Sequence, residues 1–302
     1  MSNENGPSTP EPESAAKRPE LLDATGPVVT ARFSSIDHGD RSDFTAQWKH
    51  WHRELESRRA RPHGFLAITG LHWLDDQERR FDDVPGTWSS DATGVRVVLG
   101  EGQTLEVGDH AVRGDYRFDN VDELGIAARF GDALVEVGRR DGHFMIRPRH
   151  PDHGIRANYA GTPTYPPSVD WVVRGSFVAY DAPRPITVGA SVEGLTHVYE
   201  SSGEVEFTLE GHVHRLVAFN GEGPDELFFV FADATSGTTS YAACRFLTAD
   251  APGPDRHVTL DFNRATNPPC AYTDFATCPL PPPGNHLDVR VEAGEKLPVS
   301  AH

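Results

Sequence analysis

The chain has 302 residues, of which 37% are hydrophobic and 24% are charged, and such a chain can bury a sizeable core. It carries 28 Lys and Arg against 45 Asp and Glu, a formal net charge of −17. This excess of negative charge repels phosphate backbones and anionic lipid, so we exclude nucleic acid and membrane surfaces as partners. The 28 Gly and 24 Pro favour many turns over long helices.

The N-terminal region predicts no folded element. Residues 1–40 are rich in Pro, Ser, Glu and Gly, which favours a disordered leader. No basic stretch precedes an apolar one there, so we expect no secretory signal. The three cysteines, Cys244, Cys270 and Cys278, have neither zinc-site spacing nor the even number of a disulfide framework. We therefore predict a reduced, cytoplasmic protein.

One amphipathic helix is predicted within residues 41–61, from about Asp43 to Ala60. Its apolar residues recur at the helical spacing and share one face: Phe44, Trp48, Trp51 and Leu55. Pro62 prevents continuation of the helix. We expect the two tryptophans to attach this helix to the body of the protein.

Downstream, the pattern changes to a dozen short apolar or alternating runs, from Val95–Leu99 to Leu287–Val291. A proline-rich stretch near 148–168 separates two strand-rich halves. We predict an all-β fold: a small β-sandwich over 62–150, then a larger antiparallel sheet or barrel over 151–302.

The clearest hairpin turns at Glu210–Gly211. The apolar residues that point one way on the first strand are Val205, Phe207 and Leu209. Those that line one face of the return strand are Val213, Val217 and Phe219.

The last third ends its strands in dense polar loops that combine Asn, Asp, Cys and Pro. These side chains either bond the backbone of irregular loops, as a rigid nucleus of the fold, or converge on one pocket. For the pocket, the candidate catalytic residues are Asp233, Tyr241, Arg245, Cys270 and His286. The candidate substrate-binding residues are Thr235, Asn263, Asn267 and Asn285.

Three kinds of chemistry are open to these loops. Cys270 is a candidate nucleophile, for which His286 or Arg245 would supply the base or cation that favours the thiolate. Acid–base or electrophilic chemistry is the leading enzyme hypothesis, and its residues would be Asp233, Tyr241, Arg245, Asp261 and Lys296. Metal binding is open too, and the sequence assigns no ligand set or cofactor. The candidate histidine pairs for a divalent ion are His212 with His214 and His150 with His153.

Several long motifs identify a family resemblance. FADATSGTTSY spans 231–241, DFNRATNPPCAY spans 261–272, and CPLPPPGN spans 278–285. With GLHWL at 70–74 and AGEK at 293–296, these segments resemble the family known as domain of unknown function 1684. The resemblance implies no particular reaction. In exported relatives, a disulfide between Cys270 and Cys278 is an alternative to a nucleophilic Cys270. Three segments depart from the family pattern: Ala242–Cys244 replace a glycine-rich stretch, His286 replaces an arginine, and the segment around Tyr159–Ser168 is altered. If the family binds an anion with that arginine, this chain has changed or lost that substrate.

The first half resembles more loosely the small sandwich of forkhead-associated modules, at most in topology. It lacks the Gly-Arg and Ser-x-x-His arrangement with which such modules bind phosphothreonine, so we expect a scaffold there.

We therefore predict an enzyme acting on a small polar molecule, a cofactor-free hydrolase or lyase with its pocket in the C-terminal β region. The alternative is a non-catalytic ligand-binding or protein-interaction module. The sequence does not set the oligomeric state.

Overall fold

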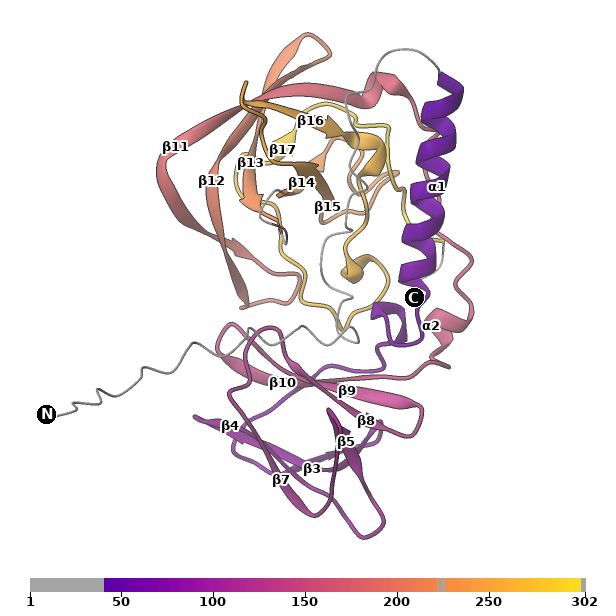
Figure 1. The fold of residues 1–302 in the computed structure, drawn as a ribbon, viewed down its shortest axis with the longest axis vertical. Coiled ribbons are helices and arrows are strands. Elements are labelled where there is room, and N and C mark those ends of the chain that lie inside the picture. Colours follow the sequence, from indigo (N-terminus) through magenta and orange to yellow (C-terminus); the bar gives the residue numbers. More distant parts are fainter. Residues whose placement is uncertain (1–40, 222, 224–225, 300–302) are drawn as a thin grey trace, which may run out of the picture.

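The computed structural model describes residues 41–221, 223 and 226–299. The leader predicted for 1–40 lies outside these residues. One long helix is followed by antiparallel sheets (Figure 1), which confirms the all-β fold class. The division into units at 62–150 and 151–302 stays a prediction. No helix within the described residues has both the length and the apolar character needed to cross a bilayer.

Helix α1 (Arg41–Arg59) confirms the predicted amphipathic helix. Its four apolar residues, Phe44, Trp48, Trp51 and Leu55, are each at most 8% exposed. The indole nitrogen of Trp48 donates a hydrogen bond to the Asn263 carbonyl oxygen at 2.8 Å. The Arg264 guanidinium lies 5.1 Å from the centre of the Trp51 ring, within cation–π range. The tryptophans thus join the helix to the C-terminal body, beside which it runs in Figure 1.

The first ten strands form a sandwich of two antiparallel sheets. The strands are β1 (His72–Trp73), β2 (Arg79–Phe81), β3 (Val84–Asp91), β4 (Gly94–Val98), β5 (Leu105–Val107), β6 (His110–Val112), β7 (Asp115–Asp119), β8 (Ile126–Phe130), β9 (Ala133–Arg140) and β10 (His143–Arg149). One sheet has the order β1-β10-β9-β8-β5-β6 and the other β2-β3-β4-β7. Their facing sides bury Trp88, Phe118 and Ile146.

A short irregular connection leads from the sandwich to the larger body. It contains helix α2 (Gly154–Ala157) and the single 3₁₀ turn η2 (Val169–Trp171). Arg156 Nε donates to the Ala60 carbonyl oxygen at 3.0 Å, so the connection packs against the C-terminal end of α1. That contact supports one wall of the cavity described below.

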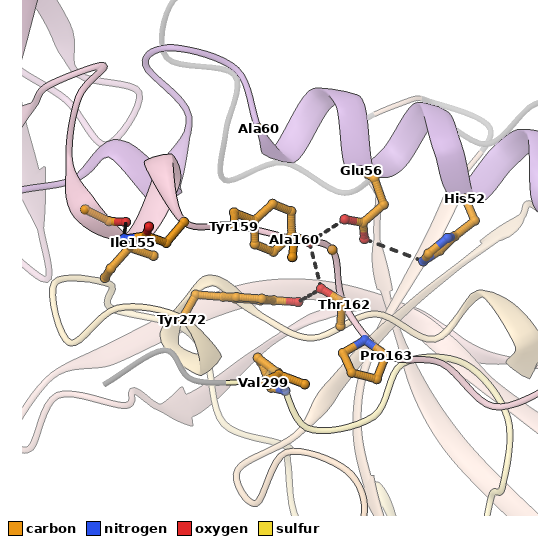
Figure 2. A pocket seen from close by; sticks show the side chains of 14 residues that line it. His52, Glu56, Ala60, Ile155, Tyr159, Ala160, Thr162, Pro163, Tyr272 and Val299 are labelled. Carbon is orange, nitrogen blue, oxygen red and sulfur yellow. Dashed lines mark hydrogen bonds and ion pairs between the residues drawn. The ribbon is translucent and has the colours of Figure 1, made fainter.

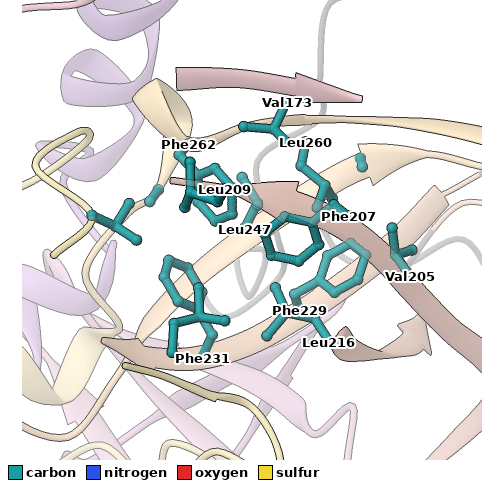
Figure 3. Close-up of a cluster of buried hydrophobic side chains, with 14 of the residues drawn as sticks. Val173, Val205, Phe207, Leu209, Leu216, Phe229, Phe231, Leu247, Leu260 and Phe262 are labelled. Carbon is teal, nitrogen blue, oxygen red and sulfur yellow. The ribbon is translucent and has the colours of Figure 1, made fainter. Parts of the chain in front are cut away.

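The larger body is an antiparallel sheet that curls into a nearly closed barrel. Its strands are β11 (Val172–Gly189), β12 (Thr196–Leu209), β13 (His212–Asn220), β14 (Glu226–Asp233), β15 (Arg245–Asp250), β16 (His257–Asp261) and β17 (His286–Leu287). The order is β15-β14-β13-β12-β11-β16, with β17 parallel to β14. Two backbone hydrogen bonds between Phe246 and Thr266 bring the two edges together. The interior is filled by apolar side chains, among them Phe207, Leu216, Phe229 and Phe262 (Figure 3).

Strands β12 and β13 confirm the predicted hairpin, with Leu209 opposite His212 and positive φ angles at both Glu210 and Gly211. The inward-pointing residues of the first strand are buried as expected. On the return strand, Leu216 and Ala218 face this same core. The face that carries Val213, Val217 and Phe219 is the outer one, where Val213 is 66% exposed and Phe219 joins a second apolar cluster.

Candidate functional site

Asp233 and Arg245 form a buried ion pair where β14 ends and β15 begins. Arg245 also donates to the Val291 carbonyl oxygen at 3.0 Å, and Asp233 accepts from the Thr235 amide at 2.6 Å. Both side chains are at most 1% exposed. The Thr235 hydroxyl is in turn bonded to another buried side chain, Ser240, at 2.7 Å. The pair therefore ties the loop after β14 and the C-terminal segment to the sheet.

The three predicted asparagines bond backbone groups. Asn285 accepts from the Val217 amide at 2.7 Å and donates to the Val230 carbonyl oxygen at 2.9 Å, so its amide bridges β13 and β14. Asn263 exchanges two hydrogen bonds with the backbone of Ser168, at 2.9 and 2.8 Å. Asn267 Nδ2 donates to the carbonyl oxygen of residue 296 at 2.7 Å. Each amide imitates a peptide group, which is how an irregular buried loop satisfies its backbone.

Tyr241 and Cys270 lie together, because the Tyr241 hydroxyl donates to the Cys270 carbonyl oxygen at 2.9 Å. The Cys270 amide donates to the sulfur of Cys278 at 3.2 Å, and all three cysteines are free and buried. A hydrogen bond from the Cys278 thiol lowers the pKa of Cys270, whereas burial raises the pKa of Cys278 and Cys244. His286 is exposed on β17.

The structure thus unites some of the predicted site residues and separates others. Asp233, Thr235 and Arg245 form one group, and Tyr241 with Cys270 forms a second. Of the histidine pairs, His212 Nδ1 lies 3.1 Å from the Glu210 carbonyl oxygen, and His153 Nδ1 lies 3.2 Å from that of Leu66. Both nitrogens face a backbone oxygen, which favours hydrogen bonding over metal ligation there.

A cavity of about 1120 Å³ opens between the second half of α1, the 154–163 connection and the C-terminal segment (Figure 2). The polar side chains that line it are His52, Glu56, Asn158, Tyr159, Thr162 and Tyr272. Its apolar lining includes Ile155, Pro163 and Val299. None of the nine predicted site residues is among the described residues that line this cavity.

A buried arginine organises the polar wall of this cavity. Arg59, only 5% exposed, donates to both carboxylate oxygens of Glu295, at 2.8 and 3.1 Å. It also donates to Glu56 Oε1 at 2.9 Å and to Thr162 Oγ1 at 2.8 Å. Burial alone would lower the pKa of Arg59, but the charge of Glu295 raises it, so the guanidinium stays protonated.

A chain of hydroxyl groups ends on Glu56 (Figure 2). Tyr159 donates to Glu56 Oε2 at 2.5 Å and contacts Thr162 Oγ1 at 2.7 Å. Thr162 Oγ1 lies 2.7 Å from the Tyr272 hydroxyl, which lies 3.4 Å from Glu295. Because Tyr159 gives its proton to Glu56, it accepts from Thr162, which in turn accepts from Tyr272. Burial raises the pKa of both tyrosines, so both phenols are neutral donors at neutral pH.

His52 completes the wall. Its Nε2 lies 3.5 Å from Glu56 Oε1, and its ring stacks on Trp48 with the ring centres 4.9 Å apart. His52, Glu56 and Arg59 occur at i, i+4 and i+7, so they form one polar line beside the apolar face of α1. That spacing is the sequence signal for this site. Among the partners, Tyr272 and Glu295 lie in the DFNRATNPPCAY and AGEK motifs, but no spacing pattern relates them, Tyr159 or Thr162 to the helix.

Three of these residues offer metal-ligand atoms within 4.8 Å of one another: His52, Glu56 and Glu295. Arg59 Nη1 already lies between the two carboxylates, 2.9 Å from Glu56 and 2.8 Å from Glu295. A divalent cation would have to displace a buried guanidinium from its carboxylate partners, at a cost of several kcal/mol. The side chains as arranged therefore do not fit a metal.

The fold is all-β with one long helix on its N-terminal side, and a cavity lies between that helix, the 154–163 connection and the C-terminal segment. A family model described as "Protein of unknown function (DUF1684)" matches residues 157–296, and the chain belongs to this family. The match includes Tyr159, Thr162, Tyr272 and Glu295, whereas His52, Glu56 and Arg59 lie outside it. The cavity is thus built jointly by the family segment and by α1.

Two further comparisons complete the picture. The chain is similar to the uncharacterized protein of the rrnAC0354 gene locus from Haloarcula marismortui, whose structure was solved by solution NMR. The two are 31% identical over 47% of this chain and 78% of the other, with a TM-score of 0.40. No curated protein matches.

Proposed function

We infer that the protein is an enzyme that performs acid–base chemistry, such as hydrolysis or elimination, on a small polar molecule held in the cavity of Figure 2. The supporting observation is the 2.5 Å hydrogen bond from Tyr159 to Glu56 at the cavity wall. It pairs a carboxylate, which accepts a proton, with a neutral phenol, which donates one.

Each group has a distinct role in this proposal. Glu56 acts as the general base toward substrate or water, and His52 positions its carboxylate. When substrate is bound, Tyr159 turns its hydroxyl proton from Glu56 to the substrate oxygen on which negative charge develops. Thr162 and Tyr272 stand behind it in the hydroxyl chain and hold its oxygen in place by hydrogen bonds. Arg59 donates to the Tyr159 oxygen at 3.1 Å, which makes the Tyr159 hydroxyl a stronger hydrogen-bond donor.

Asn267, one of the nine residues predicted from the polar loops, has a supporting role in this proposal. Its backbone amide donates to Glu295 Oε2 at 2.6 Å, and its side chain holds the carbonyl oxygen of residue 296. Glu295 in turn holds Arg59. Asn267 thus positions the carboxylate that orients the cavity's central cation.

The test is a turnover screen with two matched tyrosine variants. Purified protein is incubated with pooled small metabolites and chromogenic esters and amides, and the changing masses or absorbances are recorded. Tyr159→Phe should lower the rate of any wild-type reaction by about 10²-fold or more. Tyr165→Phe removes a buried hydroxyl bonded to Thr239, outside the described cavity lining, and should leave the rate unchanged.

The screen separates the two functions. Equal rates for wild type and Tyr159→Phe would overturn the enzyme proposal at this site. Ligand binding without turnover in any assay would instead favour a non-catalytic binding module.

A further inference from the structure

Building on the proposed function, we propose that the molecule bound in this cavity carries a positive charge, in the form of a protonated amine. The inference rests on the charges around the cavity and on which of them are already neutralised.

Arg59 is neutralised by Glu295. The two side chains share two hydrogen bonds, and Glu295 is only 1% exposed. Glu295 is also bonded to the Asn267 amide at 2.6 Å. Its oxygens are therefore occupied, and it does not line the described cavity.

Glu56 is then left as the surplus charge of the cluster. Two carboxylates and one guanidinium carry a net charge of −1, to which His52 adds a positive charge only when its ring is protonated. The Glu56 side chain keeps 18% of its surface exposed and lines the cavity, whereas the Arg59 side chain is only 3% exposed and does not. A ligand therefore meets the carboxylate before it meets the guanidinium.

No Lys or Arg is among the described residues that line the cavity. The lining phenols of Tyr159 and Tyr272 are neutral, because burial raises the pKa of both. The neighbouring Arg156 is bonded to the Ala60 and Pro151 carbonyl oxygens, at 3.0 and 2.6 Å, and is not part of the lining. An anionic ligand would thus find a carboxylate without an available cation.

The surroundings also suit an ammonium group. The Tyr159 ring is partly exposed at the cavity, where an aromatic ring attracts cations, and Ile155, Pro163 and Val299 would pack against an apolar body. The chain's net charge of −17 steers cations toward the protein and anions away. An amine with hydroxyl groups and a short carbon skeleton combines these features.

The experiment compares ligands of matched shape and different charge. A library of small amines is screened with their N-acetyl derivatives and with carboxylates of similar size, by ligand-observed NMR and thermal shift. The hexose series glucosamine, glucose and glucuronate serves as an internal set of nearly equal volume. We expect the hits to be amines, with N-acetylation weakening binding at least tenfold.

Two variants on α1 localise the effect. Glu56→Gln should weaken amine binding at least tenfold. The matched control Glu54→Gln removes a carboxylate two residues earlier, on the exposed face, where it pairs with His50, and should leave the affinity unchanged. Circular dichroism and the melting temperature show that both variants are folded.

The outcomes separate this inference from the proposed function. Hits that are mainly neutral or anionic, amine binding that survives Glu56→Gln, or no binding in any charge class would each overturn it. Amines that bind through Glu56 without being transformed would support the inference of an amine ligand and would contradict the proposed enzyme function. Turnover of an anion that depends on Glu56 would support the enzyme function and would contradict the inference of an amine ligand.

Discussion

Two buried charge clusters in this molecule have opposite compositions. In the sandwich, Glu136 faces three guanidinium groups: Arg147 at 2.7 Å, Arg149 at 2.6 Å and Arg140 at 3.0 Å. Beneath α1, Arg59 is bonded to two carboxylates instead. The first has one anion among three cations, and the second has one cation between two anions.

The two clusters also differ in what surrounds them. Glu136, Arg147 and Arg149 are at most 2% exposed. Burial alone would raise the pKa of Glu136, but the charges of Arg147 and Arg149 lower it far below its usual range. In the Arg59 cluster, one carboxylate remains partly exposed at a cavity. The contrast teaches that an ion cluster stabilises the fold when all its side chains are enclosed. Where one side chain of the cluster is partly exposed, as Glu56 is, that side chain is available for chemistry.

The largest expected effect is that of Glu136→Gln. It would leave three guanidinium groups without their shared anion, and we expect a loss of about 3–5 kcal/mol in the free energy of unfolding, measured with urea. Glu78→Gln is the control, because it breaks an exposed ion pair with Arg96 and should cost less than about 1 kcal/mol. Equal losses in the two variants would show that the enclosed cluster contributes no special stability.

Glu295→Gln should have the second-largest effect. We expect it to lower the free energy of unfolding by about 2–3 kcal/mol, since Arg59 still retains Glu56 as a charged partner. The same urea experiment measures it. A loss larger than that of Glu136→Gln would reverse our ranking of the two clusters and would make Glu56 a weak partner of Arg59.

The clusters should also respond to opposite ends of the pH range. The folded pKa of Glu136 lies below its unfolded value of about 4.3, so its contribution is present above that pH and is lost as the pH falls below it. The folded pKa of Tyr159 lies above its unfolded value of about 10, so its contribution is present below pH 10 and is lost as the pH rises further.

Urea titrations at several pH values test this contrast. The stability difference between wild type and Glu136→Gln should narrow below about pH 4, and that between wild type and Tyr159→Phe should narrow above about pH 10. Differences that stay constant across these ranges would contradict the assigned pKa directions.

The smallest effect on stability is expected for Glu56→Gln, about 1 kcal/mol, because the amide oxygen still accepts from Tyr159 and the side chain is partly exposed. Thermal unfolding measures it. A loss as large as that of Glu295→Gln would mean that Glu56 is held for stability, which would weaken its assignment as a base.

The features that could be predicted from the sequence are those with a regular residue spacing or a characteristic turn. The apolar face of α1 and the Glu210–Gly211 hairpin follow from spacing and turn chemistry, and the structure confirms both. Spacing alone did not say which side of β13 faces the barrel core, because both sides of that strand carry apolar residues.

The cavity could not be predicted from the sequence for a different reason. Its wall joins three residues of α1 to four that lie 100 or more positions from Arg59, and no periodic pattern relates them. The polar loops drew attention because Asn, Cys and Pro are dense there. Asn285 shows why density misleads: its amide makes the bonds that a neighbouring strand would otherwise make.

The attachment of α1 has a consequence for synthesis in the cell. Trp48 bonds to Asn263 and Arg59 to Glu295, across separations of 215 and 236 residues. At about 5–20 residues per second, the ribosome needs roughly 10–50 s to make the partners after the helix has emerged. Throughout that interval the two tryptophans have no native surface to cover them. Helix α1 is therefore synthesised before the strands but attached to the body only after its partners have been made. Nascent chains that stall before Glu295 should be preferred clients of chaperones.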